Sequence, residues 1–152
     1  MNLFYFIPKN LLLHEVIHLF ATLPFLFIVW KKTKSIKLII LTIFITIIID
    51  IDHILDYFLY YGFSLDFIKF LKADYFSQSG HAYVLFHGWE WLALLVIINM
   101  KSMVNIKKKW KTFWFILLFA YTPHLILDSL NVGSFLFYSI LYRLFHSFTY
   151  LV

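Results

Sequence analysis

Long apolar runs separated by short polar stretches dominate the hydrophobic pattern of this chain. A helix needs about 20 consecutive apolar residues to cross the hydrocarbon core of a bilayer. Four stretches come close to that length and predict four transmembrane helices, over residues 11–30, 36–60, 82–100 and 112–130. Residues 134–152 are also apolar, but a fifth span would place Arg143 near the bilayer centre, where a charge costs roughly 2.5 kcal/mol or more. We therefore predict an interfacial helix for this C-terminal segment.

The composition supports a membrane protein. The 152 residues are 62% hydrophobic and have a mean hydropathy of +0.84. A soluble domain of this length cannot bury so much apolar surface, because its surface-to-volume ratio requires a polar exterior. We expect an all-α bundle in contact with the lipid bilayer, and a single membrane-embedded domain over residues 1–152.

Lysines between the spans indicate the orientation. Nine of them lie between the first and second or between the third and fourth predicted spans: Lys31, Lys32, Lys34, Lys37, Lys101, Lys107, Lys108, Lys109 and Lys111. The positive-inside rule places these connections on the cytoplasmic side of a multi-pass protein of the cell membrane. Lysines that flank apolar spans, without an element that reads a nucleic-acid groove, do not predict a nucleic-acid partner. The pattern does not indicate an oligomeric state.

Acidic residues and histidines recur at one depth of the predicted bundle. They lie near the start of the first span, at the end of the second, near the start of the third and at the end of the fourth: His14, Glu15, His18, Asp50, Asp52, His53, Asp56, His87, Glu90, His124 and Asp128. Consecutive spans run in opposite directions, so all four groups reach the same, extracytoplasmic side. Ionisable groups at membrane depth are costly and usually functional. We interpret them as a metal site.

The residue types favour two or three divalent ions. Three pairs have the i, i+4 spacing that puts both side chains on one helix face: His14 and His18, Asp52 and Asp56, His124 and Asp128. The chain has no cysteine, so imidazole and carboxylate must supply the ligands. These ligands suit Zn²⁺ best, with Mn²⁺ or Fe²⁺ as alternatives.

Roles can be assigned in outline from these spacings. The expected ligands are Asp52, His53, His87, His124 and Asp128, completed by His14 or His18. Asp50 and Asp56 are candidates for carboxylates that orient ligand histidines, and Asp50 is also a candidate metal ligand. Glu90 is either a ligand or, with Glu15, a candidate catalytic base.

A sharper alternative comes from residues 14–18, which read His-Glu-Val-Ile-His. This is the zincin pattern, in which two histidines bind zinc and the glutamate acts as general base toward a peptide. An intramembrane zinc metalloprotease built on His14, Glu15 and His18 would take a later residue such as Asp128 as third ligand, but it leaves Asp50, His53 and the other candidates without a role. A membrane protein that binds metal without catalysis is a further alternative.

The order of motifs resembles the predicted membrane-bound metal-dependent hydrolases of bacteria and archaea, the group that includes a LexA-regulated membrane hydrolase. The resemblance rests on an early His in the first span, Asp50-Ile51-Asp52-His53, Phe86-His87-Gly88-Trp89-Glu90, His124-Leu125-Ile126-Leu127-Asp128 and Tyr142-Arg143-Leu144-Phe145-His146. It departs from the commonest form of the family, which has an Arg directly after the His of the third motif. If that Arg binds an anionic substrate group in relatives, Arg143 is the candidate to replace it here.

The resemblance also implies a chemistry. The wider group is similar to zinc-dependent phospholipase C and to single-strand nucleases of the same helical fold. The implied function is hydrolysis of a phosphoester, as a small molecule or as a lipid or lipid-linked substrate that reaches the site laterally, by two or three zinc ions.

Overall fold

The computed structural model describes residues 10–105 and 108–149 and is almost entirely helical over them. The elements in chain order are α1 (Leu11–Thr33), α2 (Ile36–Ile48), the 3₁₀ helix η1 (Ile49–Asp52), α3 (His53–Tyr61), α4 (Phe67–Lys72), α5 (Asp74–Ser79), α6 (Trp89–Asn105), α7 (Lys108–Val132), the 3₁₀ helix η2 (Leu136–Tyr138) and α8 (Ile140–Phe145). No β-strand occurs in this part of the chain, where an isolated antiparallel bridge joins His81 and Thr149. The predicted all-α class is confirmed.

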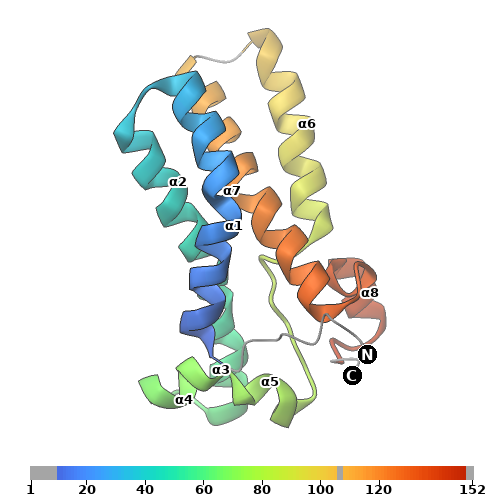
Figure 1. The fold of residues 1–152 in the computed structure, drawn as a ribbon. Coiled ribbons are helices and arrows are strands. Elements are labelled where there is room, and N and C mark those ends of the chain that lie inside the picture. Colours follow the sequence, from blue (N-terminus) through green and yellow to red (C-terminus); the bar gives the residue numbers. More distant parts are fainter. Residues whose placement is uncertain (1–9, 106–107, 150–152) are drawn as a thin grey trace.

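The four longer helices α1, α2, α6 and α7 form a bundle. Helix α7 packs against α1, α2 and α6, and α1 also packs against α2 (Figure 1). The short elements α3, α4, α5 and α8 gather at one end of this bundle, and the connection between α1 and α2 lies at the other end (Figure 1). Lys31 and Lys32 belong to the last turn of α1, so this lysine group lies at the end opposite the short helices. Lys107, another of the predicted cytoplasmic lysines, lies outside the described residues.

Three helical stretches within the described residues are long and apolar enough to cross a membrane. They are Leu11–Thr33, Ile36–Tyr61 and Lys109–Val132, and the second comprises α2, η1 and α3. Large apolar side chains on their outer faces are exposed, among them Leu12, Phe20, Phe27 and Phe44. An apolar surface of this extent indicates contact with lipid. Membrane association is therefore supported, whereas a count of four spans is not confirmed.

The predicted third span differs most from the structure. Its helix was expected to begin at residue 82, but α6 begins at Trp89 and residues 82–88 form a loop without helix. The reason lies in the neighbouring acids, because Asp56 accepts hydrogen bonds from the backbone N–H groups of Tyr83 and Val84 and Asp52 accepts one from that of Phe86. Side-chain acceptors thus replace the carbonyl acceptors that a helix would have provided.

The C-terminal segment is not a single helix, which corrects the prediction for residues 134–152. Helix η2 ends before Ser139, whose extended backbone starts the six-residue helix α8, and residues 150–152 lie outside the described part. Ser139 caps α8 by accepting a hydrogen bond from the backbone N–H of Tyr142, and it donates one to Oε1 of Glu90 at 2.6 Å. This bond ties the C-terminal segment to the first turn of α6.

Candidate metal centre

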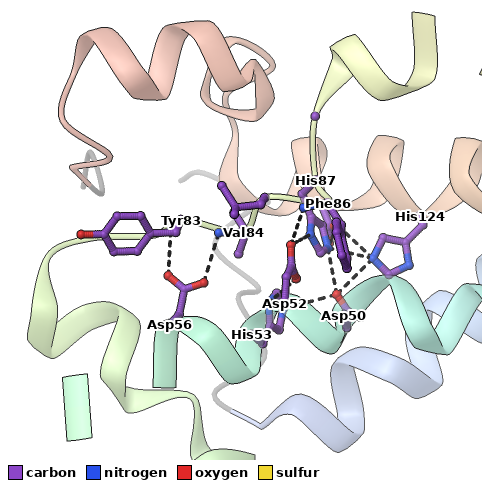
Figure 2. Close-up of polar contacts among 12 residues, drawn as sticks. Asp50, Asp52, His53, Asp56, Tyr83, Val84, Phe86, His87 and His124 are labelled. Atoms are coloured by element: carbon purple, nitrogen blue, oxygen red, sulfur yellow. Dashed lines mark hydrogen bonds and ion pairs between the residues drawn. The ribbon is translucent and has the colours of Figure 1, made fainter. Parts of the chain in front are cut away.

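Five histidines and two aspartates from five separate segments of the chain meet at the end where the short helices gather. His14 and His18 come from α1, Asp50 from η1, His53 from α3, His87 from the loop 82–88, and His124 and Asp128 from α7. All seven are buried except His14, whose side chain keeps 13% of its exposure. Figure 2 shows His53, His87 and His124 turned toward Asp50. The sequence spacing correctly placed these residues together.

The carboxylate of Asp128 divides the histidines into two pairs. Its Oδ1 lies 3.4 Å from Nε2 of His14 and 3.0 Å from Nε2 of His18. Its Oδ2 lies 3.4 Å from Nε2 of His87 and 3.3 Å from Nε2 of His124. One carboxylate therefore faces two pairs of imidazole nitrogens, and His124 also lies close enough to His14 and His18 to form one ligand group with them.

Asp50 lies beside the same two sets from the opposite helix. Its Oδ1 is 2.8 Å from Nε2 of His87, 3.2 Å from Nε2 of His124 and 3.3 Å from Nε2 of His53. Its Oδ2 is 3.8 Å from Nε2 of His14. The 3₁₀ geometry of η1 accounts for the contact with His53, because side chains three residues apart are eclipsed in such a helix.

Asp52 lies behind the ring nitrogens that face this centre. Its Oδ2 is 3.2 Å from Nδ1 of His87, and its Oδ1 is 3.4 Å from Nδ1 of His53. The Nε2 atoms of the same two rings face Asp50. A carboxylate on the far nitrogen of an imidazole fixes the tautomer and the orientation of the ring. Asp50 therefore faces the ring nitrogens that converge at the centre, whereas Asp52 contacts the opposite nitrogens of two of these rings and also forms a possible metal-holding group with His53 and His87.

The buried carboxylate oxygens and closely spaced imidazole nitrogens of this centre suit the binding of divalent cations. Both carboxylate oxygens of Asp128 and Oδ2 of Asp50 are buried without a hydrogen-bond donor. Nε2 of His14 lies 2.9 Å from that of His18, and Nε2 of His87 lies 3.1 Å from that of His124. Buried carboxylates without donors are strongly unfavourable unless a positive charge compensates them. With Asp52 included, these residues form four groups whose ligand atoms lie within 4.8 Å of one another, so the cluster could hold metal.

The loop 82–88 is fixed from both sides. Asp56 accepts from the N–H groups of Tyr83 at 2.6 Å and Val84 at 3.1 Å (Figure 2). On the other side the guanidinium of Arg143 donates to the carbonyls of Tyr83 at 2.6 Å, Val84 at 2.9 Å and His87 at 2.6 Å. These bonds satisfy a non-helical backbone and set the position of His87.

Tyr121 is a residue that sequence reasoning missed. Its hydroxyl donates to the carbonyl of Phe86 and accepts from the N–H of Gly88 at 2.9 Å. It therefore holds the loop on both sides of His87. The sequence feature that could have identified Tyr121 is its position one helical turn before His124, which places both side chains on one face of α7.

Three predicted site residues have surroundings that the sequence did not reveal. Arg143 is 1% exposed and its two terminal nitrogens bind backbone carbonyls, and burial lowers the pKa of its guanidinium. Glu90 accepts from Ser139 Oγ and from the N–H groups of Ile140 at 2.9 Å and Leu141 at 3.2 Å, so it is bound to α8. Glu15 has a buried Oε2 without a hydrogen-bond partner.

A small cavity opens onto the cluster. Its volume is about 70 Å³, and His14, His53, His87 and Asp128 form its polar wall. Its apolar wall comes from α5, from the loop before α6 and from η2: Phe76, Ala82, Val84, Phe137 and Tyr138. The space exceeds the roughly 10–15 Å³ that one water molecule needs. Water and a small polar group can therefore reach the imidazoles.

Comparisons of the chain with protein families, curated proteins and solved structures found no match. The described fold and cluster define its class on their own: a helical, membrane-associated protein with buried histidines and carboxylates that could hold metal.

Proposed function

We propose that this protein is a membrane-bound, metal-dependent hydrolase of phosphoesters that uses two divalent ions, with zinc as the metal that its imidazole and carboxylate ligands suit best. The observation that carries the proposal is the division of the cluster into two halves by shared carboxylates. One half is formed by His14, His18 and Oδ1 of Asp128, and the other by His87, His124 and Oδ2 of Asp128, with Asp50 beside both. Bridging carboxylates with histidines on each side are the ligand set of dinuclear sites in helical bundles.

The chain's own residues supply the remaining parts of the reaction. Bound divalent cations lower the pKa of water and stabilise charge that develops on phosphate oxygens. Asp52 keeps the rings of His53 and His87 turned so that their Nε2 atoms face the centre. Glu15 is our candidate for the general base, because its Oε2 has no hydrogen-bond partner and can accept a proton. Glu90 is the weaker candidate, since both of its oxygens are engaged by Ser139 and α8.

The zincin alternative uses too little of the cluster. A catalytic zinc site of that kind takes three protein ligands, and His14, His18 and Asp128 would suffice. That arrangement leaves Asp50 and His87 unused, although both are buried at the same centre. A larger ligand set favours a site with more than one ion and therefore the phosphoester chemistry.

The orientation of the site follows from the lysines. The cluster lies at the end of the bundle opposite Lys31 and Lys32, which the positive-inside rule assigns to the cytoplasm. We propose that the metal centre faces the extracytoplasmic side.

The test is metal content together with turnover. Elemental analysis of the detergent-purified protein should find about two equivalents of zinc or manganese, and the metal-loaded protein should cleave water-soluble phosphomonoesters or phosphodiesters. His124→Ala should lose both properties, whereas the matched control His81→Ala should keep both, because His81 is exposed and outside the cluster. A chain that binds no metal after reconstitution would overturn the proposal. Metal binding with cleavage of a transmembrane peptide and of no phosphoester would establish the protease instead.

A further inference from the structure

An apolar groove leads from the outer surface of the spans to the cluster. It has a volume of about 280 Å³ and runs between α1 on one side and α2, η1 and α3 on the other, with α4 at one end. Its apolar lining consists of Leu11, Leu12, Phe44, Ile47, Ile48, Ile51, Ile54, Phe70 and Leu71. Leu12, Phe44 and Ile47 are exposed on candidate membrane spans, so in a bilayer lipid chains are the neighbours of this groove.

The polar residues that line the groove are those of the metal centre. They are Glu15, Asp50 and His53. Oδ1 of Asp50 lies 2.8 Å from Nε2 of His87, which places this wall in direct contact with the proposed ion site. Oε2 of Glu15 and Oδ2 of Asp50 are buried without a hydrogen-bond partner. An apolar passage that ends at cation ligands suits a molecule with a hydrocarbon chain and an anionic head.

A second apolar groove provides the comparison. It is larger, about 530 Å³, and lies between α2, α6 and α7. Its lining includes Leu94, Ile98 and Trp114 but none of the histidines or carboxylates of the cluster. Size and apolar character alone therefore do not distinguish the first groove, whereas its contact with the metal centre does.

The small cavity gives the cluster a different opening. Leu11 and His53 line both this cavity and the first groove, so the two spaces adjoin at these residues. A chain in the groove would leave the cavity free for water and for a polar group. This arrangement separates the apolar part of a substrate from its polar part.

We propose that the groove between α1 and α2 binds the hydrocarbon chain of a lipid phosphoester whose phosphate reaches the metal centre from within the bilayer. This inference rests on the proposed phosphoester hydrolysis and names its substrate class. In the reaction, the oxygen of water forms a bond to phosphorus and the bond from phosphorus to the ester oxygen breaks. One proton of the water passes to Glu15, and Glu15 returns a proton to the departing alkoxide, which becomes the alcohol.

The first experiment fills the groove without touching the cluster. Leu12→Trp and Ile47→Trp add bulk to exposed groove positions, and Leu94→Trp is the matched control in the second groove. Each variant is assayed in mixed micelles with a long-chain phosphatidic acid and, separately, with a water-soluble short-chain phosphoester. We expect kcat/KM for the long-chain substrate to fall at least tenfold in the two groove variants and to stay unchanged in Leu94→Trp. The short-chain turnover and the metal content should stay unchanged in all three. Equal effects on both substrates, or the same effect in Leu94→Trp, would overturn the assignment of the groove.

A second readout does not depend on turnover. A phosphatidic acid with a photoreactive diazirine in its chain, reconstituted in vesicles with the metal-loaded protein, should label α1 and α2 beside the groove. Leu12→Trp should remove this labelling and Leu94→Trp should not. If the wild type cleaves no phosphoester but shows this labelling, the proposed function fails and the lipid site stands. Labelling confined to α6 and α7, or a groove occupied by a second copy of the chain with no lipid label, would overturn the inference.

Discussion

Asp50 and Asp52 should respond differently to the same isosteric change. Asp50 presents Oδ1 within 3.3 Å of three Nε2 atoms, whereas Asp52 contacts the Nδ1 atoms behind two of those rings. We therefore expect Asp50→Asn to remove at least one equivalent of metal. Asp52→Asn should keep the number of ions and lower the affinity.

The size of the Asp52 effect follows from its contacts. Loss of a carboxylate that orients a ligand histidine typically lowers metal affinity about 10- to 100-fold. Asp52 makes a hydrogen-bond contact with Nδ1 of His87 at 3.2 Å, whereas its 3.4 Å contact with Nδ1 of His53 is an ion-pair contact without a hydrogen bond. An asparagine can still accept one hydrogen bond at this position. We therefore expect Asp52→Asn to lower the metal affinity about 10- to 100-fold, which is equivalent to about 1.4–2.7 kcal/mol of binding free energy.

The assay is elemental analysis combined with titration of zinc against a chelator of known affinity. Asp66→Asn is the matched control, because Asp66 is an exposed carboxylate that caps α4 and asparagine caps a helix equally well. A full set of ions in Asp50→Asn together with loss of an ion in Asp52→Asn would refute the reasoning.

Three further changes separate structural from catalytic roles. Arg143→Leu should lower the free energy of unfolding by about 2–4 kcal/mol, because three loop carbonyls lose their hydrogen-bond donor. A thermal melt in detergent measures this loss. Unchanged melting with loss of turnover alone would indicate substrate binding by Arg143 instead. Glu90→Gln should lower stability by about 1–2 kcal/mol in the same melt and leave the metal content unchanged, since Glu90 is bound to α8. Glu15→Gln should keep the metal content and lower kcat about 10²- to 10⁴-fold, and a pH–rate profile that keeps its acidic limb and its rate would exclude Glu15 as the base.

The gathering of the site could be predicted from the sequence because it depends on two simple regularities. Spans alternate in direction, and i, i+4 spacing aims two side chains at one point. These regularities brought His14, His18, His124 and Asp128 to one end of the bundle, as the structure shows. They say nothing of which oxygen of a carboxylate faces which ring, so the relative places of Asp50 and Asp52 could not be read from spacing alone.

The loop 82–88 lay beyond such reasoning. Its residues are apolar enough to extend a span, and the reason for its non-helical course is in Asp52 and Asp56, about 30 positions earlier in the chain. The role of Arg143 is hidden in the same way, because its partners are backbone carbonyls about 60 positions away. Backbone acceptors carry no sequence signal that a motif can report.

The position of this loop also explains the C-terminal segment. Non-helical backbone at membrane depth is tolerated only where protein groups satisfy its N–H and C=O groups. Here Asp56 accepts hydrogen bonds from two loop N–H groups, and Arg143 donates to three loop carbonyls. Arg143 belongs to α8, and Glu90 links this helix to α6 by hydrogen bonds. An apolar anchor on the membrane surface would need neither the buried guanidinium nor the bond to Glu90. The C-terminal segment therefore contributes to the centre, because Arg143 bonds the carbonyl of His87 and those of the loop residues before it.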